Sequence, residues 1–499
     1  MSYGSPASRP SPSSKVQAAL AEDSLGTPSV ISFVLGAVAT LTVAAGVVPQ
    51  LFAVTGETSI GIAFFAVALV LVVFSIGYVA MAGRTIHAGA LYSFIARGLG
   101  RPLGVGAAFV AFVAYSLLAV GLFGAFGAIS AGLLQQWAGA SSPWWAWALG
   151  SWLVVLVLGL RRIDLSGRVL LVLAGGELLV VGLLTIAGFL QPASGIDIAA
   201  SLDPKVLLGS GGGPLLATAL LGYVGFEYAP VLGEETRNPG RVIRRATFGA
   251  LILMGLVFGL SSLAMTVHYG RHQVVETAQN AGPDTLFTMG GPVLANAGRV
   301  LFVTSLFAAM VAFHNGVARY LFALGREGVL PTSLGIPNRF GAPSKASMVQ
   351  SLIGLAVIAV YAAFHLDPMT QLFFWGGVTG GFGVMLLILV TSVAVIGFFA
   401  RDRRDVNLFA AFVAPALAAL ALGFMVWQVV ANFAGLLGVQ PRSLLAWLLP
   451  TSYAVVAILG IVWGLVLKAT RPQVYEAIGL GSAAVVGPTP PAPLPAHVA

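Results

Sequence analysis

The chain has 499 residues, of which 58% are hydrophobic and only 8% are charged. A soluble domain carries about 25% charged residues, so most of the outside of this protein must face lipid. The 25 Lys and Arg residues exceed the 17 Asp and Glu residues, but they sit in short connections between apolar runs, so we expect no nucleic-acid partner. The absence of cysteine excludes disulfides, thiolate metal sites and cysteine nucleophiles.

The two ends of the chain differ in composition from the rest. Residues 1–28 are rich in Ser, Pro and Ala and lack a signal-peptide pattern, and they are predicted to form a disordered cytoplasmic tail. Residues 471–499 are predicted to be a second cytoplasmic tail, largely disordered, because they become rich in Pro and Ala from Gly479 onward. One membrane domain, 29–470, lies between them.

Twelve apolar runs in this domain are long enough to span a bilayer, which needs about 20 helical residues. We therefore predict an all-α integral membrane protein with twelve transmembrane helices. The predicted spans are 30–53, 60–82, 103–135, 143–160, 166–190, 214–232, 242–267, 292–324, 346–364, 370–399, 407–433 and 446–468.

The basic residues also predict the orientation of these spans. With the N-terminus in the cytoplasm, 21 of the 25 Lys and Arg residues fall in cytoplasmic segments. Such an excess is the expected pattern for cytoplasmic loops, and an odd number of spans would destroy it. Both termini are therefore predicted to be cytoplasmic, in a multi-pass protein of the cell's inner membrane.

The first predicted span contains an unusual stretch. Residues 36–46 are small or hydroxylic and precede Pro49, which favours an interruption of the helix. Irregular backbone at membrane depth is tolerated only where protein or a water-filled cavity receives it. The candidate site residues in this stretch are Ala39, Thr40, Leu41 and Thr42.

Two acidic residues fall well inside the spans, Glu177 in the fifth and Glu227 in the sixth. Placing a carboxylate at the bilayer centre costs about 2.5–3.5 kcal/mol on insertion scales, so each should face a cavity or a partner. Glu227 has a structural role open to it, as an acceptor of hydrogen bonds from a loosened helix. For Glu177, the alternatives are a neutral side chain bonded to a neighbouring helix and a proton carrier.

The sixth span is interrupted at a position that matches the first. Gly222 and Gly225 lie three residues apart and weaken the helix around Leu221, Tyr223 and Phe226. Interrupted helices at matching positions of two halves indicate a binding site near the midplane. The alternative for this glycine pair is close helix packing.

Two further spans carry candidate residues. His314 lies midway along the eighth span, where it is either a packed, hydrogen-bonded side chain or a group that transfers protons. The tenth span contains four glycines in 376–381, which favour flexibility or close packing, and Thr379 among them is a candidate contact to the substrate side chain.

Three segments together resemble the amino acid–polyamine–organocation family. Residues 225–246 begin with Gly-Phe-Glu and continue into Glu-Glu-Thr-Arg-Asn-Pro-Gly-Arg-Val-Ile-Arg-Arg-Ala, similar to the family's sixth helix and following loop. Residues 318–331 resemble the end of its eighth helix, and 87–94 resemble the segment after its second helix. The resemblance covers about 30–470 and implies a LeuT-type fold, with a five-plus-five inverted repeat and two peripheral helices.

The family resemblance also implies where substrate binds. A substrate carboxylate would meet N–H groups at the break in helix 1, and an ammonium would meet carbonyls of helices 1 and 6. Leu221 stands where a gate aromatic is common, which leaves Tyr223 or Phe226 as substitutes. The predicted substrate-binding residues are Ala39, Thr40, Leu41, Thr42, Leu221, Gly222, Tyr223, Gly225, Phe226, Glu227 and Thr379.

We therefore predict a secondary active transporter of amino acids or related amines and polyamines, working by alternating access with proton symport. Glu177 and His314 are the candidate coupling residues. The six histidines form no HExxH pattern, and we expect no enzyme activity, cofactor or metal. The alternatives are an amino acid or amine exchanger and a non-transporting nutrient sensor on the same fold.

Overall fold

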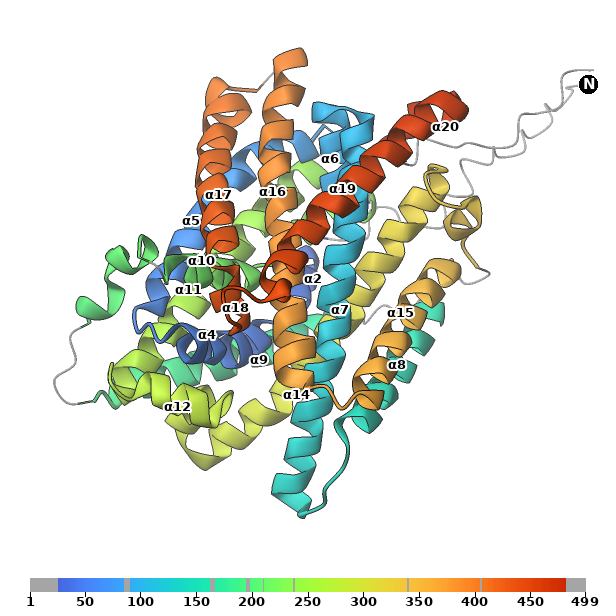
Figure 1. Cartoon of the computed structure of the whole chain (residues 1–499). Helices are drawn as coiled ribbons and strands as arrows, with labels where there is room; N and C mark the ends of the chain where they lie inside the picture. Colours follow the sequence, from blue (N-terminus) through green and yellow to red (C-terminus); the bar gives the residue numbers. More distant parts are fainter. Residues whose placement is uncertain are drawn as a thin grey trace, which may run out of the picture.

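A computed structural model describes residues 26–84, 90–161, 167–193, 198–209, 211–236, 238–338, 341–403 and 406–481. These residues form a helical bundle without strands (Figure 1). Helices predominate because lipid offers the backbone no hydrogen-bond partners, so each spanning segment must satisfy its own N–H and C=O groups.

The first half of the bundle contains five spans, of which the first is broken. Its elements are α2 (Thr27–Val38), α3 (Thr40–Thr42), the π-helix η1 (Val43–Val47), α4 (Val48–Thr55), α5 (Ile60–Ala82), α6 (Ala90–Leu99), α7 (Arg101–Ala138), α8 (Trp144–Arg161) and α9 (Gly167–Leu190).

The second half repeats this order, again starting with a broken span. Its elements are the 3₁₀ helices η2 (Ala200–Leu202) and η3 (Pro204–Leu207), α10 (Gly212–Leu221), the 3₁₀ helix η4 (Phe226–Glu235), α11 (Pro239–Tyr269), α12 (Val274–Ala281), α13 (Asp284–Phe287), η5 (Thr288–Gly290), α14 (Gly291–Arg326), η6 (Thr332–Gly335), α15 (Ser344–Ala363), the π-helix η7 (Pro368–Trp375) and α16 (Gly376–Arg401).

Two further spans follow the repeats. They are formed by η8 (Phe409–Val413) with α17 (Ala414–Ala431), then α18 (Phe433–Leu437) and α19 (Leu444–Thr470), and the described chain ends after α20 (Pro472–Ala477). Thus 472–477, in the predicted C-terminal tail, is helical, whereas 1–25 and 482–499 lie outside the described residues.

The predicted number of spans agrees with this architecture. Among the described residues, eleven helical stretches are long and apolar enough to cross a membrane. The remaining predicted span, the sixth (214–232), is split into α10 and η4 and therefore does not count as one continuous helix. The described residues thus match the twelve predicted spans, with the first and the sixth interrupted.

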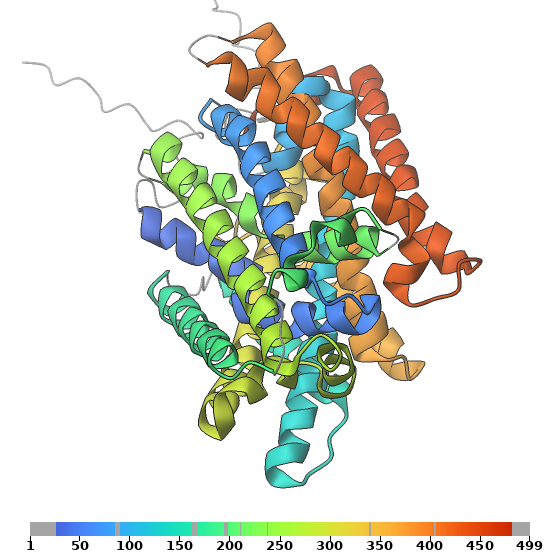
Figure 2. The same ribbon diagram turned by 90° about the vertical axis from the view of Figure 1, so that its left-hand side faces the viewer.

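Helices at equivalent positions of the two halves pack against each other. α5 contacts α11, α7 contacts α14, and α2 contacts η4. α16 and α17 stand side by side, and α19 crosses the bundle obliquely toward α20 (Figures 1 and 2). This pairing brings the broken first and sixth spans together in the interior.

Candidate functional site

The first span is broken at Ala39. This residue adopts a left-handed conformation, with φ 54° and ψ 71°, and α2 ends immediately before it. The amide of Leu41 donates to Glu177 Oε2 at 3.0 Å, and the amide of Thr42 donates to Ser305 Oγ at 3.3 Å. The interruption predicted within 36–46 is confirmed, and the amides that it frees donate to side chains of α9 and α14.

The sixth span is broken between Leu221 and Phe226. Gly225 has φ 118°, a conformation that side chains rarely adopt, and its amide donates to Glu227 Oε2 at 2.9 Å. Tyr115 Oη donates to Glu227 Oε1 at 2.7 Å. This interruption is confirmed as well, and Glu227 has the structural role considered for it, since it accepts a hydrogen bond from the unwound backbone.

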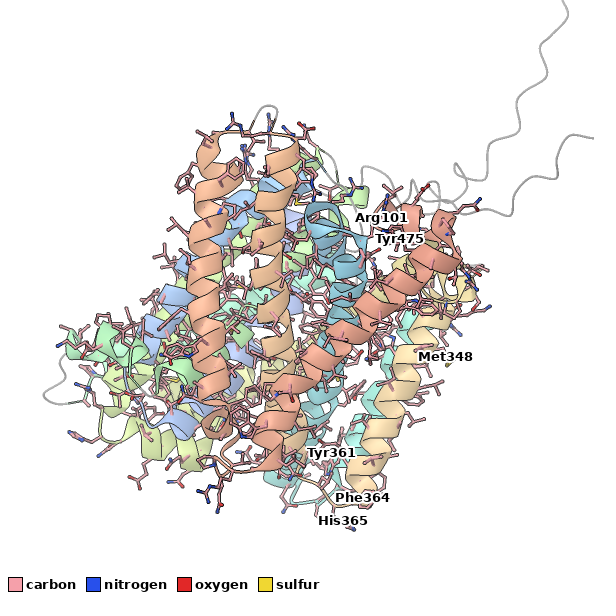
Figure 3. All side chains as sticks on the ribbon, turned by 45° about the horizontal axis from the view of Figure 1, so that its top comes forward. Arg101, Met348, Tyr361, Phe364, His365 and Tyr475 are labelled. Carbon is pink, nitrogen blue, oxygen red and sulfur yellow. The ribbon has the colours of Figure 1, made fainter. Side chains whose placement is uncertain are left out.

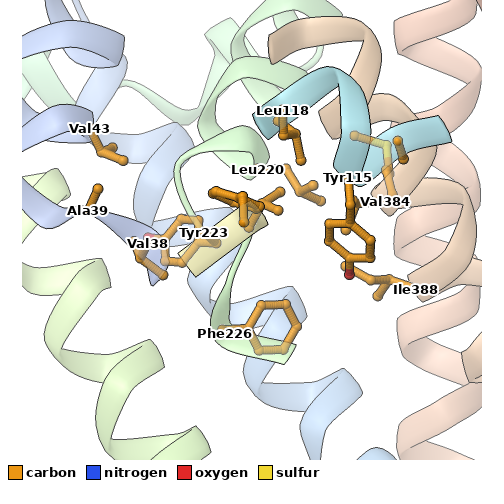
Figure 4. Packing of buried hydrophobic residues seen from close by; sticks show 14 of the residues in the cluster. Val38, Ala39, Val43, Tyr115, Leu118, Leu220, Tyr223, Phe226, Val384 and Ile388 are labelled. Carbon is orange, nitrogen blue, oxygen red and sulfur yellow. The ribbon is translucent and has the colours of Figure 1, made fainter. Parts of the chain in front are cut away.

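The two breaks are in direct contact. A Cβ atom added to Gly225 would lie 3.0 Å from the Val38 side chain and from its backbone nitrogen. A Cβ at Gly222 would lie 2.8 Å from the Val43 side chain. Figure 4 shows Val38, Ala39 and Val43 of the first span near Tyr223 of the sixth. Both glycines therefore allow an approach that a larger residue would prevent.

A cavity lies beside the breaks. Its volume is about 60 Å³, which is enough for several waters, since one water needs about 10–15 Å³. Its walls come from the first, third, sixth, eighth and tenth spans. The lining residues are Val38, Ala39, Thr42, Val43, Gly46, Val47, Gln50, Leu118, Leu122, Leu221, Val224, Ala309, Phe313, Phe373, Phe374 and Gly377.

Three of the predicted substrate-binding residues line this cavity, namely Ala39, Thr42 and Leu221. The remaining ones do not line it. Of these, Leu41, Gly225 and Glu227 take part in the hydrogen bonds at the two breaks, whereas Tyr223 Oη donates to the backbone oxygen of Phe64 at 2.7 Å. The other predicted residues that do not line the cavity are Thr40, Gly222, Phe226 and Thr379.

The two coupling candidates lie in different surroundings. Glu177 is 4% exposed and holds the amide of Leu41, next to the cavity-lining Thr42. His314 is 3% exposed and its Nε2 lies 2.8 Å from Ser347 Oγ of α15, which fits the packed, hydrogen-bonded alternative. Only Glu177 therefore contacts a broken helix directly.

Sequence reasoning missed the apolar walls. Leu118 and Leu122 of α7 are four residues apart, and so are Phe373 and Gly377 at the start of the tenth span. Residues at this spacing share one helix face. The signal was a helical period in apolar residues, which is indistinguishable in sequence from ordinary packing.

An aromatic cluster lies between α5, α6, α7, η4 and α14. Its rings are stacked, tilted or packed edge-to-face, with centroids 5.0 to 6.2 Å apart. Glu227 borders this cluster through its bond to Tyr115. Phe313, which lines the cavity, packs against Tyr115 and Tyr228, so the cavity adjoins the cluster. The cluster consists of Phe74, Tyr78, Tyr92, Phe94, Tyr115, Phe226, Tyr228 and Tyr320.

The described residues contain no group of three His, Cys, Asp or Glu side chains that would hold a metal ion. The site instead consists of two broken helices and a cavity, as in carriers of small solutes. A family model described as amino acid permease matches residues 25–467. The chain belongs to this family. Its fold is therefore the LeuT-type fold predicted from the motifs, and the family is one of transporters rather than enzymes.

Curated relatives share parts of the chain. The low-affinity putrescine importer PlaP of Escherichia coli is 25% identical over 190 residues, 37% of this chain and 39% of that protein. The branched-chain amino acid permease BcaP of Lactococcus lactis is 23% identical over 187 residues, 37% of each chain. An uncharacterized transporter of Mycobacterium tuberculosis is 32% identical over 161 residues, 30% of this chain and 34% of that protein. The matches thus span well under half of the curated relatives.

Proposed function

We propose that this protein carries amino acids or related amines across the cytoplasmic membrane by proton-coupled symport. The observation that supports this most is the position of Glu177 at the break in the first span. Its carboxylate holds the amide of Leu41, while Ala39 and Thr42, on either side of Leu41, line the cavity. The coupling group and the substrate cavity therefore share one short segment of irregular backbone.

Protonation of Glu177 would act directly on this segment. An ionised carboxylate is a stronger acceptor of backbone N–H bonds than a neutral acid. A proton arriving at Glu177 weakens its hold on Leu41 and lets α3 and η1 move, and loss of the proton restores the bond. A proton can leave a buried carboxyl only when water reaches it, so release of the proton is coupled to access of water.

The proposed orientation places α6 and α20 at the cytoplasmic side. It rests on the 21 of 25 basic residues that fall in cytoplasmic segments when both termini are inside. In this orientation the aromatic cluster closes the cytoplasmic half, and the cavity lies in the outer half. Alternating access then requires the cluster to separate while the outer walls close.

The test uses purified protein in proteoliposomes, with amino acids and diamines as labelled solutes. Wild-type protein should concentrate its solute when the outside is acidic, and Glu177→Gln should lose this response but retain exchange at equal pH. Glu276→Gln, an exposed residue of α12, is the matched control and should behave as wild type.

Three results would contradict parts of this proposal. Concentration of solute by Glu177→Gln under a pH gradient would exclude Glu177 as the proton carrier. Exchange without any gradient response in the wild type would identify an antiporter. Binding without uptake or exchange would identify a nutrient sensor.

A further inference from the structure

The chemistry of the cavity walls differs from what a diamine requires. Only Thr42 and Gln50 contribute polar side chains to the lining, and none of the lining residues is charged. The two buried acidic residues nearest the breaks are engaged elsewhere: Glu177 with Leu41, and Glu227 with Tyr115 and the unwound backbone.

The second ammonium group of a bound diamine would therefore face apolar side chains. Moving an ion into apolar surroundings without a partner is strongly unfavourable even after the protein relaxes. The amides of Leu41, Thr42 and Gly225 already have acceptors. One ammonium and one carboxylate can still be stabilised by the partial charges at the ends of the broken helices. The wall formed by Leu118, Leu122, Phe313 and Phe373 offers only apolar contacts to the rest of the solute.

We infer that the cavity selects zwitterionic amino acids with aliphatic side chains and rejects diamines and charged amino acids. This inference rests on the proposed function. Leu122 is the residue best placed to test it, because truncating this lining side chain enlarges the cavity without adding a charge. Leu117 lies on the same helix but does not line the cavity, so it provides a matched truncation.

The experiment measures binding by thermal shift and by titration of purified protein with leucine, isoleucine, putrescine, arginine and glutamate. Leucine and isoleucine should bind, and Leu122→Ala should weaken leucine binding about tenfold to hundredfold, as expected for lost methylene contacts. Leu117→Ala should leave the affinity unchanged.

Saturable putrescine or arginine binding that excludes leucine would overturn the inference, as would equal affinity for leucine in the two alanine variants. Failure of the transport proposal is distinguishable from these outcomes. Leucine binding without uptake would refute transport and retain the assignment of substrate class, whereas putrescine uptake would do the reverse.

A different part of the molecule supports a second inference. The described end of the chain docks on the face formed by α6, the start of α7 and the end of α14. The amides of Gly479 and Gly481 donate to the two oxygens of Glu327 at 3.2 and 3.1 Å. Arg97 Nε donates to the Gly479 carbonyl at 2.9 Å, and an Arg101 N–H donates to the Glu476 carbonyl at 3.0 Å.

Side-chain packing reinforces these bonds. The Arg101 guanidinium lies 5.3 Å from the centre of the Tyr475 ring, and Figure 3 shows the two side chains together at the edge of the bundle. Ile478 is buried, and a Cβ at Gly479 would contact Ala96 of α6 at 3.3 Å. The segment 472–481, which we call the C-terminal latch, is thus bound through both N–H and C=O groups of its backbone.

The receptor of the latch is continuous with the helix breaks. Glu327 is fully buried and also accepts a hydrogen bond from Tyr92 Oη at 2.8 Å. The amide of Tyr92 donates to Tyr320 Oη, and the Tyr320 ring packs against Tyr115, which holds Glu227. In addition, α6 contacts η4, the second half of the broken sixth span.

We propose that the C-terminal latch stabilises the conformation closed at this face and slows its opening. Departure of the latch removes two N–H donors from a buried carboxylate, which is unfavourable unless the surrounding residues rearrange. The residues that would rearrange first are those of the aromatic cluster, because Tyr92 shares Glu327 with the latch.

The natural absence of cysteine allows a direct test. Ala229 of η4 is fully buried beyond Glu227, so Ala229→Cys reports opening of this face through its rate of maleimide labelling in membranes. Two truncations are compared on this background. One ends at Ile478 and removes both donors to Glu327, and the other ends at Gly481 and keeps them.

Labelling should be at least severalfold faster for the chain ending at Ile478 than for the chain ending at Gly481. If truncation lowers expression, Gly481→Pro in the full chain removes one donor and is incompatible with the local φ of 65°. Equal labelling rates in the two truncations, or in Gly481→Pro and its parent, would show that the segment only packs against the bundle and would overturn the proposal.

Discussion

The two helix breaks have the same position in the repeat but are stabilised in different ways. At the sixth span, the acceptor for the freed amide of Gly225 is Glu227, only two residues away. At the first span, the acceptor for Leu41 is Glu177, which is 136 residues away on another helix. The sixth-span break carries its own acceptor, whereas the first-span break depends on α9 and α14.

We expect this difference to separate a structural carboxylate, Glu227, from a coupling carboxylate, Glu177. Glu227 is held by an amide, by Tyr115 and by the geometry of a glycine turn, so changing it should mainly affect folding. Glu177 links two helices across a segment that also lines the cavity, so changing it should mainly affect coupling. Substitutions at the two breaks test this division.

The largest effect is expected for Gly225→Leu, which should abolish transport. A leucine would have to adopt φ 118° and place its Cβ 3.0 Å from Val38, so the two broken helices could no longer touch. The measurement is uptake into proteoliposomes by protein of verified membrane insertion. Gly175→Leu is the control, because a Cβ there meets nothing within 4 Å. Wild-type uptake by Gly225→Leu would refute the role of this turn.

Glu227→Ala should lower stability by more than Glu177→Ala. It leaves both the Gly225 amide and the Tyr115 hydroxyl without their acceptor, and each buried orphan group costs about 1–3 kcal/mol. Glu227→Gln retains one acceptor oxygen and should fall between Glu227→Ala and wild type. The midpoint of thermal unfolding in detergent gives the order, and a larger loss at Glu177 would reverse the assignment of structural and coupling carboxylates.

The fold was largely predictable from the sequence. Apolar length and the charge of the connections decide where a chain crosses a membrane, and the predicted spans match the helices to within a few residues. Both breaks were also predicted, because Gly222, Gly225 and the small residues around Ala39 weaken a helix locally. The predicted cytoplasmic orientation and the limits of the two tails stay predictions.

The cavity walls and the C-terminal contacts could not be predicted in this way. Leu118, Leu122 and Phe373 are apolar and follow the same helical spacing as lipid-facing or packed residues. Only the tertiary structure shows that they line a cavity. Glu327 lies 152 residues from Gly479, so no local pattern connects them. The last residues are rich in Pro and Ala, so composition alone gave no sign of the C-terminal latch that precedes them.

The smallest expected effect concerns Ala39, which holds the first-span break in a left-handed conformation without being glycine. That conformation costs a non-glycine residue roughly 1–2 kcal/mol, and glycine relieves it but loses about 0.5–1 kcal/mol of chain entropy. Ala39→Gly should therefore match or slightly exceed wild-type stability, and Ala39→Val should fall below it, because a β-branched residue tolerates positive φ poorly. Thermal unfolding midpoints of the three proteins give the order. If Ala39→Gly were the least stable, the methyl group on the cavity wall would outweigh the backbone strain, and this break would be maintained by packing rather than by its hydrogen bonds to Glu177 and Ser305.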